Sequence, residues 1–146
     1  ESALISIAID IGIRESRKLK GVHILTGDEI INCTRFEDSI ALGNYDIDIH
    51  NPEGTGTSHY FFPKGAYYTI PYRSLIPKGV ENLLVAGRCL SADKKAFASL
   101  RVQASCMDMG QAAGTAAAMA AISGLSVQEV DTEKLVAKLR ELGSII

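Results

Sequence analysis

The segment Tyr45–His50 alternates polar side chains with isoleucines and reads Tyr-Asp-Ile-Asp-Ile-His. On a strand this alternation places Asp46, Asp48 and His50 on one face and the isoleucines on the other. Carboxylates and imidazoles transfer protons near neutral pH, so this face could hold acid–base groups, a metal site or simply solvated side chains on an edge strand. The metal interpretation is disfavoured, because groups two residues apart on a strand diverge and the spacing does not establish His59 as a further ligand.

A second pattern with chemical potential lies in the C-terminal half. The apolar run 83–86 ends at Gly87 and predicts a fully buried strand. A polar loop over 88–98 follows, and Ser99 is expected to cap a helix over about residues 100–122. A strand, a glycine, a loop and a helix start in this order are the arrangement by which α/β folds hold ligands at the ends of strands.

The start of that helix is expected to present free backbone N–H groups at Arg101 and Val102, which would suit a flat, electron-rich ligand. The same helix carries Gly110, Gly114 and Ala118 at a spacing of four. Such a smooth face lets another backbone or a flat ligand approach closely. The alternative is an ordinary helix packed on a sheet, whose glycines serve close packing alone.

Two further groups could take part in chemistry. In Arg14-Glu15-Ser16-Arg17, a strand would turn Arg14 toward an anionic ligand, and the alternative is a surface ion-pair cluster. Cys89, beside Arg88, could be a reactive thiol or a merely buried one. The sequence contains neither a CxxC nor a GxSxG motif, so it indicates no zinc site, disulfide scaffold or serine nucleophile.

Length and composition limit the class of protein. The 146 residues carry a net charge of −2, with 47% hydrophobic and 22% charged residues, which is typical of one globular domain. The basic clusters are too short for a nucleic-acid footprint. The longest uncharged apolar stretch near the C-terminal end, 112–122, is too short to span a bilayer. Because the chain opens on Glu1, we expect it to be a piece of a longer protein.

The elements that must position these residues predict an α+β fold. Strands are expected at 22–25, 45–50, 59–62 and 66–70, and the alternation over 5–13 fits a strand or a helix turn. The turn Pro63-Lys64-Gly65 is expected to pair the last two strands. Further helices are expected over 28–33, opened by a Thr26–Glu29 capping box, and over 131–142. We therefore expect a β-rich segment 1–70 and a strand–loop–helix segment 71–146 in one compact unit.

Four segments together carry a more specific signal. They are Gly12-Ile-Arg-Glu-Ser-Arg17, Asp46-Ile-Asp-Ile-His50, the run Ile70-Pro-Tyr-Arg-Ser-Leu-Ile-Pro-Lys-Gly-Val-Glu-Asn-Leu-Leu-Val-Ala-Gly-Arg-Cys-Leu-Ser91, and the run Ala98-Ser-Leu-Arg-Val-Gln-Ala-Ser-Cys-Met-Asp-Met-Gly-Gln-Ala-Ala-Gly-Thr-Ala-Ala-Ala118. In this order they resemble the FAD-dependent oxidoreductase family that includes proteins often labelled xanthan-lyase-like. The resemblance covers nearly the whole chain.

The resemblance implies a two-part flavoprotein of the glutathione-reductase type, whose N-terminal Rossmann half binds the ADP part of FAD. That half is expected to be missing here, since the only approach to a GxGxxG motif is Gly54-Thr-Gly56. FAD is then expected in the full-length protein and not in this chain alone. The expected partners are the N-terminal half and a small-molecule substrate. The isolated chain is expected to be inactive and to self-associate through its exposed apolar face.

The resemblance also assigns residues. It places Gly87 and Arg88 near the ribityl and pyrophosphate part of FAD, and Ser99, Arg101 and Val102 near the pyrimidine edge of the flavin. A helix start and an arginine would stabilise the negative charge of reduced flavin there. The alternative for Arg101 is a surface or interdomain ion pair.

On the substrate side, the resemblance favours catalytic or binding roles for Asp48, His50 and Arg14. The implied reaction is hydride transfer between a substrate C–H and the flavin, with a side chain handling the proton. The alternative is a non-catalytic binding or assembly module.

Overall fold

The computed structural model describes residues 6–7, 9–10, 12–13, 15–50 and 54–146, and it has the predicted α+β class. Within these residues, β1 (Ser39–Gly43) pairs with β4 (Tyr68–Pro71), and β2 (Ile47–His50) pairs with β3 (Thr57–Tyr60), both antiparallel. The helices are α1 (Gly27–Ile31), α2 (Lys94–Leu100), α3 (Gln103–Ser123) and α4 (Thr132–Glu141), with 3-10 turns at Tyr72–Ser74 and Val127–Glu129. No helix in this part of the chain is long and apolar enough to cross a membrane.

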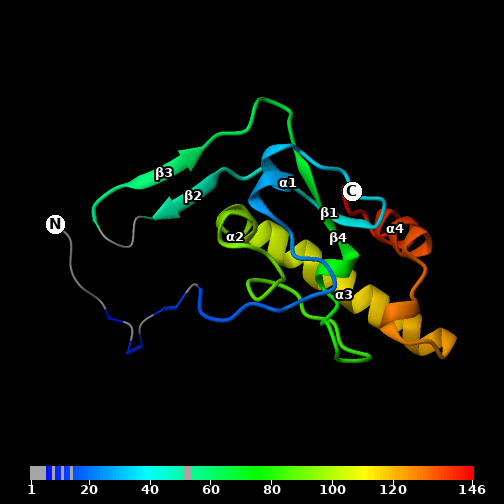
Figure 1. Ribbon diagram of the computed structural model, residues 1–146. Helices are drawn as coiled ribbons and strands as arrows, with labels where there is room; N and C mark the ends of the chain where they lie inside the picture. The colour runs from blue at the N-terminus through cyan, green and yellow to red at the C-terminus, as the bar shows by residue number, and fades with distance from the viewer. Residues whose placement is uncertain (1–5, 8, 11, 14, 51–53) are drawn as a thin grey trace.

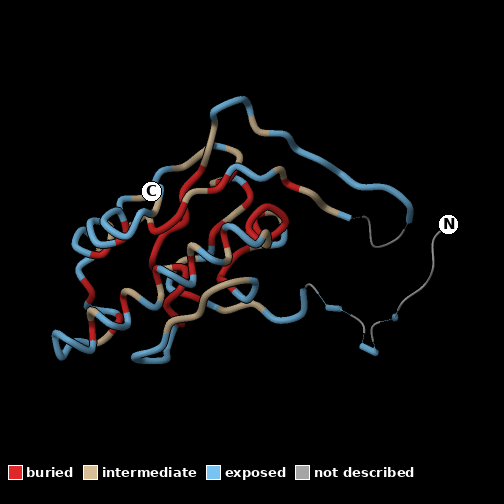
Figure 2. Tube along the Cα trace, turned by 180° about the vertical axis from the view of Figure 1, so that it is seen from behind, coloured by how far each residue is buried: buried red, intermediate tan, exposed pale blue. Residues whose placement is uncertain are grey.

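The core lies between the β1–β4 sheet and the helices that cover it (Figure 1). The long helix α3 packs on β1, and α4 packs on both. A buried alanine recurs at every fourth position of α3, at 112, 116 and 120, so the helix can approach the strands closely. The amphipathic helix α4 contributes Leu135 and Leu139. Burial is therefore concentrated in the middle of the molecule (Figure 2).

The β2–β3 ribbon extends away from this core (Figures 1 and 2). All four residues of β3 are exposed, whereas all four residues of β4 are buried. The predicted pairing of 59–62 with 66–70 is therefore wrong. The turn between them does form, since the Ala66 N–H donates to the Pro63 carbonyl at 2.9 Å, but it leads the chain from the exposed sheet to the buried one. A buried strand must satisfy its backbone groups against a buried neighbour, and β1 supplies it.

The predicted buried strand over 83–86 is also wrong. This segment is irregular and only partly buried, and the Val85 N–H donates to the Leu75 carbonyl at 2.9 Å. An apolar run forms a strand only where another strand offers a ladder, and none of the described strands lies against it.

Two N-terminal segments likewise depart from the prediction. The segment 22–25 forms no strand and has isolated bridges at its edges, from Gly21 and Leu25. Of the alternating isoleucines, those at 7, 9 and 13 are exposed and outside any strand, and those at 5 and 11 lie outside the described residues. Alternation without a partner strand or a core to cover does not settle the local conformation.

Two helices, α2 and α3, replace the single helix predicted over 100–122. The first begins earlier because Asp93 caps it: its carboxylate accepts from the Ala96 N–H at 2.7 Å and from the Gly27 N–H at 2.9 Å. One side chain therefore fixes the start of both α1 and α2. Ser99 lies in the last turn of α2 and is fully buried, so its predicted role as an N-cap is wrong.

The break between the helices lies at Arg101 and Val102. Arg101 ends α2, and Val102 has an extended backbone (φ −75°, ψ 156°) from which α3 begins. Val102 makes no side-chain cap to the new helix.

Short-range signals predicted the remaining helix ends well. The capping box of Thr26 and Glu29 is present, and α1 spans Gly27–Ile31 against the expected 28–33. Gly124, with φ +66°, ends α3. The Asp131 carboxylate caps α4 by accepting from two backbone N–H groups. Each of these signals acts within one helical turn, which is why sequence alone suffices for them.

Tyr68 joins several elements of the core. Its ring lies across Gly43, its cross-strand partner on β1, so closely that a methyl group at position 43 would collide with it. Its hydroxyl donates to Ser99 Oγ at 2.7 Å, because the Ser99 hydroxyl itself donates to the Tyr45 carbonyl. The chain of hydrogen bonds ties β4, α2 and the segment before β2 together, and it gives Ser99 a structural role.

Two buried tyrosines are expected to make the folded state less stable at alkaline pH. Burial raises the pKa of Tyr68 and of Tyr72 to about 12, and the Ser99 hydrogen bond lowers that of Tyr68 only in part. In the unfolded chain both should ionise near pH 10. Their stabilising contribution is therefore complete below pH 10 and is lost as the pH rises toward 12, on the order of 2 kcal/mol for Tyr68. Urea unfolding followed by circular dichroism between pH 9 and 12 measures this, and Tyr68→Phe should flatten the profile. A profile that the phenylalanine leaves unchanged contradicts the assignment.

Candidate functional site

A cleft of about 280 Å³ opens where β2 packs on α2. It is lined by Glu15, Asp48, Ile49, His50, Lys94, Phe97, Ala98 and Arg101. The alternation of β2 explains its polar wall: Ile47 is buried on one face, and Asp48 and His50 lie on the other. Because α2 ends at the same place, Arg101 is brought to this wall from 53 residues further along the chain.

The carboxylate of Asp48 is the centre of a charged cluster. Arg101 Nη2 donates to the Asp48 carbonyl at 3.1 Å and lies 3.5 Å from Oδ2. His50 Nε2 lies 3.6 Å from the same Oδ2, and His59 Nε2 lies 3.9 Å from Oδ1. His59 reaches Asp48 because the two residues are direct partners in the β2–β3 ladder. The side chains of one carboxylate, one guanidinium and two imidazoles therefore share one face.

Burial separates the parts of this cluster. The side chains of Asp48 and Arg101 are 16% and 14% exposed, whereas those of His50 and His59 are 53% and 42% exposed. Asp48 Oδ1 is buried and has no hydrogen-bond partner among the described atoms. A buried carboxylate with spare acceptor capacity stabilises the protonated form of a nearby imidazole. The arrangement therefore places the Asp48 carboxylate beside the His50 imidazole at the mouth of the cleft.

The structure places the predicted site residues unevenly. It brings Asp48, His50 and Arg101 together in one cleft. Arg14 lies outside the described residues. From the sequence, His59 was considered only as a metal ligand. Its place opposite Asp48 depends on the β2–β3 register, which residue types do not determine. Among the described residues no group of three His, Cys, Asp or Glu side chains is arranged to hold a metal ion.

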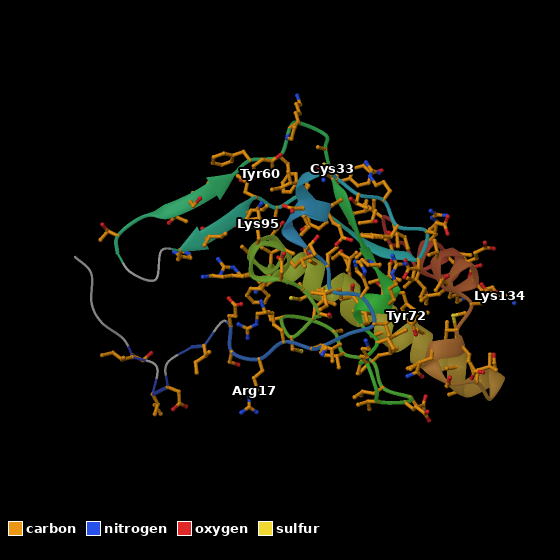
Figure 3. All side chains as sticks on the ribbon, in the orientation of Figure 1. Arg17, Cys33, Tyr60, Tyr72, Lys95 and Lys134 are labelled. Atoms are coloured by element: carbon orange, nitrogen blue, oxygen red, sulfur yellow. The ribbon has the colours of Figure 1, made fainter. Side chains whose placement is uncertain are left out.

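A second, more open cleft of about 310 Å³ adjoins the segment that supplies Glu15. It is lined by Ile13, Ser16, Arg17, Arg88 and Cys89. The Leu19 N–H donates to the Cys89 carbonyl at 2.8 Å and so holds the N-terminal segment beside the loop that follows Gly87. Arg17 projects outward from this segment (Figure 3). The described lining contains two arginines and no carboxylate, so this cleft favours an anionic group.

Arg88, in the loop after Gly87, has an electrostatic effect on the Cys106 thiol near the start of α3. Burial raises the pKa of the Cys106 thiol; the positive charge of Arg88 acts in the opposite direction, and the Cys89 thiol adds to the increase. All three cysteines are free. Arg88 therefore lies close enough to Cys106, in the first turns of α3, for its charge to act on the thiol.

Comparison with known proteins decides the family. The sequence matches the family model of FAD dependent oxidoreductases over residues 1–139. The chain belongs to the FAD-dependent oxidoreductase family. The sequence has no significant match to a curated protein or to a solved structure. The match supports a flavin-dependent oxidoreductase in general terms.

In a member of the FAD-dependent oxidoreductase family, some residues must accommodate the flavin, and two regions of this chain fit. Gly87 has φ +90°, and a Cβ built there would meet no atom within 4 Å, so the backbone can be approached closely. The exposed Arg88 follows it and can hold a phosphate. At the start of α3, no side chain caps the first N–H groups, and Gln103 and Ala104 are exposed. Free N–H groups suit the acceptor edge of a flavin.

Two details of the expected cofactor contacts need correction. The Arg101 N–H is not free, because it donates to the Phe97 carbonyl at 3.2 Å, so the free donors begin after Arg101, where α3 starts. Ser99 turns its hydroxyl into the core toward Tyr68 and the Tyr45 carbonyl, and so away from any ligand. Both differences follow from the helix break, which moves the second helix start past Arg101.

Proposed function

We propose that this chain is the C-terminal, flavin-proximal part of an FAD-dependent oxidoreductase of the glutathione-reductase type, which transfers a hydride between a small-molecule substrate and flavin. The observation that carries the proposal is the cleft in which Arg101 and His50 lie beside Asp48. It lies beside the regions that fit a flavin. Arg101 lines it and immediately precedes the start of α3, and Glu15 lines it and is followed in the sequence by Ser16 and Arg17, which line the arginine-containing cleft.

Each residue has a part in this proposal. Gly87 and Arg88 hold the ribityl–phosphate part of FAD, and Val102 and the N–H groups after it face the pyrimidine edge. FAD, when bound, supplies or accepts the hydride. His50 accepts or returns the substrate proton at Nδ1, since its Nε2 faces Asp48, and Asp48 stabilises the imidazolium that results. Arg101 pairs with Asp48 and so holds its carboxylate at the wall of the cleft.

The partner that completes the site is an N-terminal Rossmann half of the same protein, which would bind ADP. The exposed face of α3 supports this part of the proposal. Met107 and Ile122 are 73% and 88% exposed there, and Gly110 and Gly114 have nothing packed against them. An apolar, smooth helix face of this kind is typical of an interface. In the absence of the N-terminal half, the same face would promote self-association of the chain.

Flavin binding by the chain itself tests the proposal. Titration with FMN, followed by flavin fluorescence polarisation, should give weak but saturable binding that ADP does not displace. Arg88→Ala should weaken FMN binding by roughly 5-fold, because a charge-assisted contact to the phosphate is lost, and should leave riboflavin binding unchanged. Arg140→Ala is the matched control, since Arg140 lies on α4 and its guanidinium donates to the Ile146 carbonyl. Polarisation that stays at the value of free FMN would favour a non-catalytic binding or assembly module.

A further inference from the structure

Among the described residues, each charged side chain that lines the Asp48 cleft has an ion-pair partner, with one exception. Asp48 pairs with Arg101, and Glu15 Oε1 lies 2.9 Å from Lys18 Nζ. Lys94 lines the same cleft and is exposed, and it takes part in none of the ion pairs that the described residues form. In the part of the chain that the structure describes, both carboxylates therefore have a cationic partner, and Lys94 is the one positive charge of the cleft, at its α2 side, that has none.

The neighbouring lysine shows that this is a property of position and not of helix α2. Lys95 projects from the same turn of the helix (Figure 3) but pairs with Asp28 of α1, with 3.3 Å between Nζ and Oδ1. Lys95 does not line the cleft. One step along a helix rotates a side chain by about 100°, which is enough to turn the second ammonium away from the cleft.

The remaining wall of the cleft is apolar. Ile49, Phe97 and Ala98 line it between the polar groups of β2 and Lys94. A ligand that satisfies all of these surfaces has an apolar body and a single negative charge at one end. A neutral amide of the same shape would set its NH₂ group or its weaker carbonyl dipole against the ammonium, and it would lose the charge–charge attraction.

We infer that the cleft takes a small carboxylate with an apolar body, whose carboxylate is bound by Lys94 and whose other end lies at His50 and Asp48. As a statement about substrate this rests on the proposed function, in which His50 handles the proton. Lys94 then determines specificity: it selects acids over neutral analogues and sets which end of the molecule meets the imidazole. The ammonium is suited to this task because it is a compact charge on a flexible stem that adjusts to ligands of different length.

Binding of phenylacetate and phenylacetamide to the wild-type chain tests the inference without flavin. Chemical shifts of the backbone amides lining the cleft report the site, and each titration yields a dissociation constant. Phenylacetate should bind roughly 5-fold more tightly than the amide, as expected for one partly solvated ion pair. This preference should shrink as salt is added.

Two matched variants assign the preference to a residue. Lys94→Gln should lower the affinity for phenylacetate by roughly 5-fold and bring the acid and the amide to equal affinity. Lys95→Gln removes the same net charge from the same helix and should leave the preference intact. Equal binding of acid and amide by the wild type, no saturable shift with either, or the same loss in both variants would overturn the inference. These titrations contain no flavin, so a negative result would overturn the carboxylate site without affecting the result of the FMN titration. A negative FMN titration would likewise leave the assignment of Lys94 as a carboxylate site intact.

Discussion

Replacement of His50 by alanine is expected to slow substrate-dependent reduction of the flavin by about 100-fold or more in the FAD-loaded protein, because a positioned proton-transfer group contributes about 100- to 10,000-fold. The FAD content should remain nearly unchanged, since the regions that fit the cofactor lie around Gly87 and the start of α3. Stopped-flow absorbance of the flavin measures the rate, and the absorbance before mixing measures the FAD content.

Two neighbouring substitutions sharpen this result. His59→Ala should have a smaller effect, because His59 lies further from Asp48 and does not line the cleft. Ile49→Asn changes an isoleucine that packs against the core and also lines the cleft, and it should damage folding through a poorly paired amide. Wild-type rates in His50→Ala would show that this imidazole is only a solvated side chain of the strand. A fully stable Ile49→Asn protein would show that Ile49 contributes little to the core.

Replacement of Arg101 by methionine is expected to lower the free energy of unfolding by about 2 kcal/mol or more. Removal of one member of a largely buried ion pair leaves the other charge without compensation, which in fully buried cases costs about 3 to 5 kcal/mol. Arg101 and Asp48 retain some exposure, so we expect the lower part of that range or slightly less. Urea unfolding at neutral pH measures the difference.

The double variant provides the control. Removing the Asp48 carboxylate as well, in Arg101→Met with Asp48→Leu, should recover most of the lost stability, because no unpaired charge then remains in the cleft. Strict additivity of the two single changes would contradict a direct interaction. The cycle also separates stability from chemistry, since the double variant should fold well and still lack the ability to stabilise a protonated His50.

The sequence predicted those features that depend on a few consecutive residues. The capping box at Thr26, the glycine that ends α3 and the aspartate that caps α4 each act within one turn of helix. The polar face of β2 followed from alternation alone, because the side chains of any strand alternate.

Features that depend on distant segments were not predictable in the same way. Strand β4 pairs with β1 because both are buried, and nothing in the residues 66–70 identifies that neighbour. The helix start at Asp93 prevailed over the one expected at Ser99 because Asp93 also binds the Gly27 N–H, a contact across 66 positions. The proximity of His59 to Asp48 depends on the register of β2 against β3, which residue types leave open.

The contact between Gly43 and Tyr68 has a consequence for how this sequence can evolve. A side chain cannot be added at position 43 while the ring stands across it, and the ring cannot be lost without leaving a void beneath the glycine and an unmet hydrogen bond at Ser99. Each single change is therefore harmful, although a joint change to two medium-sized residues would fill the same space. We therefore expect positions 43 and 68 to change together in evolution, because a substitution at one is tolerated only when the other residue also changes.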